Sequence, residues 1–361
     1  MRLNYFFRSP SRTVRLLLPA GVFLLVLAAG KNPGLARDKT CMEQDHRTFN
    51  VYIENDAIAG DDGQYTGGVK LTWSRYGLSA LPGDAWLHKW MYPLVRKIGW
   101  DDPDPGEKAL TFSAGQNIYT PDDIDTHELI EDDRPYAGIT YVEWGFHKRF
   151  EHYMHTVGLF AGIVGPESGA EDIQSTFHDV FNSNEANGWD HQLKNEPVLG
   201  LVYDYKRKFF TQGDYEGVGS DIIFNVGGNL GNALTSINSG LLLRYGWNLP
   251  HDFGNFAIQP ATCFNAEIEE KYCQRDERRF GVHVFCSANA SVVLQDIFLD
   301  GNTFTDSHSV DKKPLVGTFA GGLCMITGPF KTVLAYICQT KAFDGQDDPQ
   351  VYGSLNVSYH Y

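Results

Sequence analysis

The chain has 361 residues, enough for a sizeable core and for one or two domains. Its 45 acidic residues outnumber the 30 Lys and Arg residues, which leaves a formal net charge of −15 at pH 7. An acidic chain without a basic stripe argues against nucleic acid as a partner, whereas its surface is compatible with bound divalent cations.

The N-terminus is typical of a secretory signal peptide. Four arginines precede an apolar run over residues 16–29: Arg2, Arg8, Arg12 and Arg15. The run is shorter than the ~20 residues that a membrane-spanning helix needs, although an uncleaved anchor remains the alternative. We therefore expect a signal peptide over residues 1–36, cleaved after Ala29 or Ala36, and an exported domain over residues 37–361.

From residue 49 onward, apolar and polar residues alternate with a period of two, as in β-strands whose two faces differ. Val69, Leu71 and Trp73, for example, alternate with Lys70 and Thr72. Such strands form either a soluble sandwich with the apolar face in its core, or a membrane barrel with that face toward lipid. No apolar stretch after the N-terminus is long enough for a membrane helix.

Three features favour the barrel. The chain begins with an export signal, and Trp and Tyr recur near the strand ends, as in the aromatic girdles of membrane barrels. The last alternating segment also runs to Tyr361, and a terminal strand that finishes on an aromatic residue resembles the assembly signal of bacterial outer-membrane barrels. We therefore predict an all-β fold, an antiparallel transmembrane β-barrel in the bacterial outer membrane.

About twelve strands are expected, an even number as in bacterial barrels. They begin near residues 49, 65, 108, 138, 155, 197, 219, 237, 278, 314, 331 and 351. If the N-terminus is periplasmic, the odd-to-even connections, such as 57–64 and 120–136, are extracellular. The connections 77–107 and 248–277 are then long periplasmic segments, and the pattern does not explain their length. Residues 85–91 have the composition of a small amphipathic helix at the membrane interface.

The six cysteines leave the redox state open. Cys263 and Cys273 flank a short loop and could form a disulfide, which an exported compartment permits. Cys286, Cys324 and Cys338 lie in apolar runs that resemble strands, where buried free thiols fit the pattern equally well.

The barrel topology brings several polar residues to the same, outer end. Asn55 and Asp56 end the first strand, and Thr66 begins the second. The connection between the fifth and sixth strands contains a short amphipathic helix, residues 170–181, which includes His178. Histidine titrates near neutral pH and is a natural general base. Taken singly, however, an Asn-Asp pair is more often a turn, and a histidine in a loop helix is more often structural.

Short motifs follow one another along the whole chain after the signal. Besides the helix of His178 they are residues 54–56, 65–68, 116–121, 133–138, 165–166, 188–196, 243–247 and 299–304. Each motif alone is weak, but in this order they resemble the lipid A 3'-O-deacylase family of bacterial outer-membrane proteins. The resemblance implies a twelve-stranded barrel that removes the 3'-linked acyloxyacyl chain of lipid A, part of lipopolysaccharide, in a calcium-dependent reaction.

Carried over residue by residue, the resemblance implies active-site roles for Asn55, Asp56, Thr66 and His178. In such a site His178 would deprotonate a water molecule that attacks the ester, and Asn55 would donate a hydrogen bond to the oxyanion. No serine lies in a recognisable nucleophile motif, which favours an activated water over an acyl-enzyme.

The metal side of the implied site departs from the family. The family has a glutamate six residues after the histidine, where this chain has Asn184, and Glu185 follows one position later. The oxygen ligands implied for Ca2+ are Asp56, Thr66 and Glu185, together with backbone carbonyls. A family lysine in the 120–136 connection has no clear counterpart in this chain.

Two rival functions stay open. An outer-membrane phospholipase is also a calcium-dependent barrel, but its His-x-Ser-Asn-Gly signature is absent, and His283 and Ser287 do not reproduce it. The second rival is a structural or transport barrel without enzymatic activity, although small barrels fill their narrow lumen with side chains. We expect a monomer whose partners are lipopolysaccharide and the outer membrane.

Overall fold

The computed structural model describes residues 46–56, 64–78, 92–93, 95–97, 99–100, 106–181, 186–212, 217–254 and 280–361. The expected signal peptide over residues 1–36 lies outside the described residues and stays a prediction. The same holds for the helix expected over residues 85–91 and for the pairing of Cys263 with Cys273. The cysteines among the described residues are free thiols: Cys286, Cys324 and Cys338.

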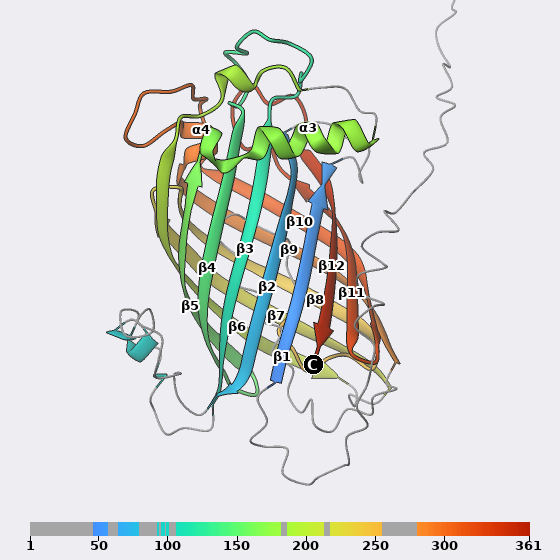
Figure 1. The fold of residues 1–361 in the computed structure, drawn as a ribbon. Helices are drawn as coiled ribbons and strands as arrows, with labels where there is room; N and C mark the ends of the chain where they lie inside the picture. Colours follow the sequence, from blue (N-terminus) through green and yellow to red (C-terminus); the bar gives the residue numbers. More distant parts are fainter. Residues whose placement is uncertain are drawn as a thin grey trace, which may run out of the picture. The chain divides into compact units, whose positions relative to one another are not determined.

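Twelve antiparallel strands close into a barrel (Figure 1). They are β1 (His46–Asn55), β2 (Gln64–Leu78), β3 (Glu107–Thr120), β4 (Ala137–Arg149), β5 (Tyr153–Val164), β6 (Glu196–Gln212), β7 (Val218–Gly231), β8 (Leu234–Trp247), β9 (Phe280–Asp296), β10 (Leu315–Thr327), β11 (Phe330–Gln339) and β12 (Gln350–His360). Each strand pairs with its sequence neighbours, and β1 closes the barrel on β12, from Thr48 opposite His360 to Asn55 opposite Gly353. The predicted twelve-stranded antiparallel barrel is confirmed.

The two faces of the wall have opposite chemistry. Polar side chains point into the lumen in alternation and are buried there, among them Thr48, Asn50, Lys70, Glu143 and Asn356. Large apolar side chains are exposed on the outside, among them Trp73, Phe112, Leu243, Leu323 and Leu334. A soluble barrel would bury its apolar face, so this arrangement is that of a barrel surrounded by lipid.

The connections divide between the two ends of the barrel. The odd-to-even connections, including residues 121–136 and 297–314, lie at what we call the loop end. The opposite end, where β1 begins and the backbones of Arg47 and Tyr361 are hydrogen-bonded, is the terminus end. The helices described at the loop end are η3 (Pro166–Ser168), α3 (Ala170–Phe181), η4 (Trp189–His191) and α4 (Ile297–Asp300). Among the described residues, none of the helices has the length and apolar character needed to cross a bilayer.

The long connection after β8 enters the lumen at the terminus end. Phe253 is 2% exposed and belongs to one buried cluster with Ile223 and Leu242, which point inward from β7 and β8. Residues 250–254 therefore fill this end of the lumen, which accounts for part of the connection's unexpected length. The rest of the connection, residues 255–279, lies outside the described residues.

Buried ion pairs hold this segment to the wall. Arg244 of β8 donates to the two carboxylate oxygens of Asp221 on β7, at 2.8 and 2.6 Å, and also pairs with Asp252. Lys331 of β11 pairs with the other oxygen of Asp252 at 2.6 Å. All four side chains are buried, and buried charges need such partners to remain ionised. Asp252 thus joins β8 to β11 at the terminus end, and Arg244 extends the network to Asp221 of β7.

Two described residues of the long connection after β2 pack on the outside of the wall. Val95 and Trp100 are buried against Phe146 and Leu159, which point outward from β4 and β5. The ring centroids of Trp100 and Phe146 are 5.9 Å apart. The connection therefore shields part of the apolar wall near the terminus end.

Candidate active site

The loop ends of β1 and β2 bring three of the predicted site residues together. Asn55 Nδ2 donates a hydrogen bond to the backbone oxygen of Thr66 at 2.8 Å, and the hydroxyl oxygens of Thr66 and Thr120 are 2.8 Å apart. Asp56 follows directly on β1 and is fully buried. Because the Asn55 amide is fixed by the neighbouring strand, its side chain is held in one orientation.

Asn55 belongs to the lipid-facing side of the wall. Along β1, Tyr52 and Glu54 are buried toward the lumen, and Ile53 and Asn55 alternate with them on the outside. At the loop end of the strand and on this face, a polar side chain is expected to meet lipid headgroups rather than the lumen. An amphiphile could therefore reach the tip of β1 without leaving the membrane.

Helix α3 begins on the outside of the same wall. The backbone oxygen of Ser168 accepts hydrogen bonds from Gln116 Nε2 and from Thr140 Oγ1, both at 2.7 Å. Ala170, the first residue of α3, packs directly against Gly138 of β4. From there α3 runs across the wall in the direction of β1 (Figure 1). The helix and the β1 tip thus share the lipid-facing side at the loop end.

The position of His178 is known only at the level of the helix. The helix predicted over residues 170–181 is α3, and it includes His178. The His178 side chain lies outside the described part of the structure, and so do Asn184 and Glu185. Contact between His178 and the Asn55 tip therefore stays a prediction.

A polar network next to Thr66 has no counterpart among the predicted site residues. Gln64 Nε2, at the start of β2, donates to Asp122 at 2.9 Å and to Asp133 at 3.1 Å. The backbone N–H of Asp122 donates to the second carboxylate oxygen of Asp133 at 2.8 Å. These bonds fix the β3–β4 connection to the strand that carries Thr66. No periodic pattern marks residues 121–136, so sequence spacing could not reveal this contact.

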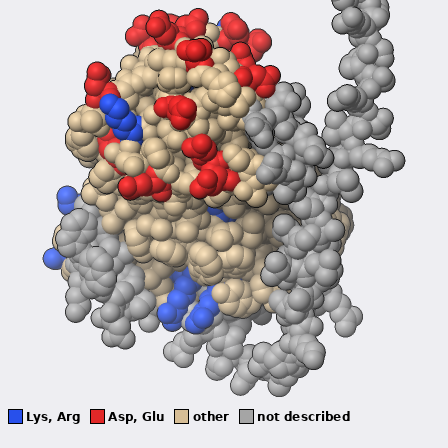
Figure 2. Space-filling model, turned by 45° about the horizontal axis from the view of Figure 1, so that its top comes forward, with Lys and Arg blue, Asp and Glu red and all other residues tan. Residues whose placement is uncertain are grey.

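The loop end is strongly acidic. Figure 2 shows Asp and Glu side chains gathered over this end of the molecule. The β3–β4 connection alone exposes several of them: Asp123, Asp125, Glu128, Glu131 and Asp132. Such a surface attracts divalent cations and other positive groups at moderate ionic strength. The acidic surface that the net charge suggested therefore lies at the loop end.

The donors present at the β1–β2 tip fit the chemistry of calcium only in part. Asp56 supplies a carboxylate and Thr66 a hydroxyl, and oxygen atoms are what Ca2+ takes. The third predicted ligand, Glu185, is not among the described residues, and within those residues no three Asp, Glu, His or Cys side chains form a metal-binding group. Asp56 and Thr66 would thus supply two oxygen ligands of the ion, with further oxygens supplied from elsewhere.

The contact of Gly138 with Ala170 offers a test of the helix position. A Cβ at Gly138 would collide with Ala170 and with the Ser168 hydroxyl, so Gly138→Val is expected to push the start of α3 off the wall. Since a displacement of about 1 Å can cost about 10²-fold in rate, we expect a loss of that order in any activity that needs α3. Gly321→Val is the control, because only one atom, at 3.9 Å, lies near its added Cβ.

Comparisons with known proteins agree with this architecture. Residues 18–361 match the family described as outer membrane protein LpxR. No curated protein matches the chain. Among solved structures, LpxR from Salmonella typhimurium superposes with a TM-score of 0.68 at 17% identity, over 86% of this chain and 99% of that one. The β-domain of the Bordetella autotransporter BrkA gives a TM-score of only 0.37 at 10% identity, over 88% of this chain and 97% of that one. Because the family match spans nearly the whole chain, this protein belongs to the LpxR family of outer-membrane proteins.

Proposed function

We propose that this protein is an outer-membrane hydrolase that removes the 3'-linked acyloxyacyl chain of lipid A. The observation that carries the proposal is the shared lipid-facing position of the β1 tip and α3 in a chain of the LpxR family. A luminal site would require lipid A to leave the leaflet. A site on the outer wall leaves its acyl chains in the membrane and its ester linkages at the level of the loop end.

In the proposed reaction, His178 takes a proton from a water molecule as that water attacks the ester carbonyl. The carbonyl oxygen becomes an oxyanion, and Asn55, oriented by its bond to Thr66, donates a hydrogen bond to it. The tetrahedral intermediate then collapses, and the protonated His178 returns its proton to the sugar oxygen that leaves. The products are the acyloxyacyl chain as a free carboxylic acid, with its secondary ester intact, and a lipid A hydroxyl at the 3' position.

Calcium belongs to the proposal as a required ion, held in part by Asp56 and Thr66. Bound there, Ca2+ would supply positive charge to the ester carbonyl. Removing divalent cations with EGTA is expected to abolish deacylation by the purified protein, and added CaCl2 is expected to restore it, whereas MgCl2 at the same concentration is expected to restore less. The measurement is release of the acyloxyacyl acid from lipopolysaccharide in detergent. Full activity in excess EGTA would remove the ion from the proposal.

The filled lumen counts against a transport function. Lys70 and Glu143 form a buried ion pair at 2.6 Å inside the barrel, and Phe253 and its neighbours occupy the terminus end. Side chains that fill a narrow lumen leave little room for a solute. The alternative is a structural role without catalysis, and the decisive experiment must distinguish it from the deacylase function.

The decisive experiment is mass spectrometry of lipid A from a host strain with and without the expressed protein. The proposal expects a new lipid A species that lacks the mass of the 3' acyloxyacyl chain. If activity is latent in intact cells, the purified protein should produce the same species from extracted lipopolysaccharide. An unchanged lipid A spectrum in both settings would favour the structural alternative.

A further inference from the structure

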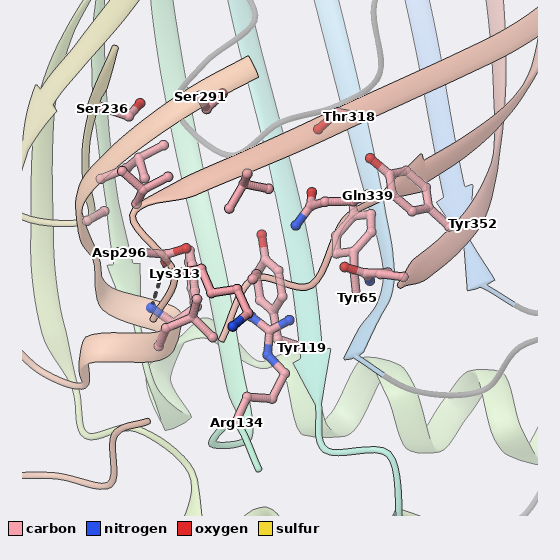
Figure 3. A pocket seen from close by; sticks show the side chains of 18 residues that line it. Tyr65, Tyr119, Arg134, Ser236, Ser291, Asp296, Lys313, Thr318, Gln339 and Tyr352 are labelled. Carbon is pink, nitrogen blue, oxygen red and sulfur yellow. Dashed lines mark hydrogen bonds between the residues drawn. The ribbon is translucent and has the colours of Figure 1, made fainter. Parts of the chain in front are cut away.

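A cavity of about 130 Å³ lies inside the lumen at the loop end (Figure 3). It lies beside α4, and its lining comes from both halves of the chain, including Tyr65, Arg134, Asp296, Gln350 and Tyr352. It is separate from the proposed active site, because the lining residues point inward whereas Asn55 belongs to the outer face of the wall. Nothing in the proposed reaction uses this cavity.

Arg134 brings a guanidinium without hydrogen-bond partners among the described residues to the cavity. Its side chain is 6% exposed, and its guanidinium lies over the Tyr119 ring, 4.6 Å from the centroid. The guanidinium makes no hydrogen bond to any residue that the structure describes, and its Nε is fully buried. Burial lowers the pKa of Arg134, although the negative groups nearby, chiefly Asp296 and then Tyr119, Asp133 and Asp122, oppose this effect. A buried guanidinium of this kind is costly unless its N–H groups find acceptors.

The carboxylate of the lining makes its hydrogen bond to the backbone and not to Arg134. Asp296 precedes α4, and its carboxylate accepts a hydrogen bond from the backbone N–H of Phe298 at 3.0 Å, which caps the helix. Lys313, the other cation of the lining, pairs with Asp344. Arg134 is therefore the cation of this cavity whose donors are left for something that enters it.

Gln350 supplies a second donor. Its side chain is 5% exposed, and Nε2 has no hydrogen-bond partner among the described residues. Gln350 begins β12, whereas Arg134 lies in the β3–β4 connection, so the two donors reach the cavity from different parts of the barrel. Two hydrogen-bond donors without acceptors thus border one cavity, and a ligand with several acceptor atoms would satisfy both.

We propose that this cavity binds a small oxyanion, a carboxylate or a phosphate, with Arg134 as its charged partner and Gln350 as a neutral donor. The guanidinium fork matches the paired oxygens of either group. The volume limits the ligand to roughly ten heavy atoms, because a single water takes up roughly 10–15 Å³ measured in this way. The competing possibility is that the cavity holds only water, in which case added oxyanion would give no saturable binding.

Isothermal titration calorimetry on the purified full-length protein in a zwitterionic detergent tests the proposal. Sodium phosphate and sodium acetate are titrated separately against sodium chloride at matched ionic strength. At least one of the two oxyanions is expected to give saturable heat with one site per chain, and which of them binds identifies the ligand class. Heats equal to those of chloride for both oxyanions would overturn the proposal.

Variants assign the binding to this cavity. Arg134→Gln is expected to weaken the binding of the oxyanion at least about tenfold, the loss expected for one charge-assisted hydrogen bond. Arg207→Gln is the matched control, because Arg207 lies on the outer face of β6 over Phe209 and should leave binding unchanged. If Arg134→Gln does not fold, as judged by β-sheet circular dichroism, Gln350→Leu provides the second variant and is expected to weaken binding less. Undiminished binding in the folded variants would place the anion elsewhere and overturn the assignment.

Discussion

Replacing His178 with alanine is expected to lower the rate of lipid A 3'-deacylation by about 10²- to 10⁴-fold, which is the contribution of a positioned general base. The barrel should fold normally, because His178 lies in a helix outside the strand ladder. The measurement is mass spectrometry of lipid A after incubation of lipopolysaccharide with equal amounts of folded protein. Near-zero conversion with an unchanged circular dichroism spectrum is the expected result.

His191→Ala is the control for this experiment. His191 also lies at the loop end, in η4, and its Nε2 is 3.1 Å from the backbone oxygen of His127. Its exchange removes a loop histidine without touching α3, so deacylation should change less than about twofold, roughly 0.4 kcal/mol. If His178→Ala retained the activity of His191→Ala, His178 would not be the base, although the deacylase function itself could still stand.

The barrel could be predicted from the sequence because the pattern that marks each strand is local. Alternation of apolar and polar residues is set by the geometry of a strand, so each strand could be found from a few consecutive residues. The largest errors in the expected starts are three residues, at β1, expected near 49 and found at His46, and at β8, expected near 237 and found at Leu234. The helix predicted over residues 170–181 was found for the same reason, since its apolar residues recur at helical spacing.

Contacts between distant segments could not be predicted from local sequence patterns. Asp252 and Lys331 are 79 positions apart, and residues 250–254 enter the lumen although their sequence carries no strand or helix pattern. Gly138 looks like an ordinary glycine of a strand until α3 is seen packed on it. Arg134 belongs to a motif that marked the family resemblance, but only the closed barrel reveals that its guanidinium borders a cavity.

Part of the candidate site could be predicted from the sequence, as the strands could, and part could not. Topology alone put Asn55, Asp56 and Thr66 at one end of the barrel, and their hydrogen bonds follow from neighbouring strands. The position on the lipid-facing side did not follow from topology, because it depends on which residues of β1 alternate inward. That side is the one from which a membrane lipid can approach, so this detail links the fold to the proposed substrate.

The ion pairs at the terminus end lead to the largest expected effect on stability. Asp252→Asn keeps the size of the side chain but leaves Arg244 and Lys331 buried without the charge that they share. Removing one partner of a buried ion pair costs about 3–5 kcal/mol, so the free energy of unfolding should fall by about that amount. Asp344→Asn is the control, because Asp344 pairs with Lys313 at the exposed surface, where a pair contributes about 0–1 kcal/mol. Urea unfolding in detergent, followed by circular dichroism, measures both variants.

The same carboxylate predicts how stability depends on pH. Burial alone would raise the pKa of Asp252, but Lys331 and Arg244 outweigh burial and hold the pKa well below its usual range. A carboxyl whose pKa is lower in the folded state stabilises the fold above its unfolded pKa of about 3.9, and this contribution is lost as the pH falls toward the folded pKa. The wild-type protein should therefore lose stability on acidification below about pH 4, more steeply than Asp252→Asn, which has no carboxyl to protonate there. Parallel curves for the two proteins between pH 5 and pH 2, roughly the range over which such a group acts, would show that Asp252 does not hold the terminus end together by its charge.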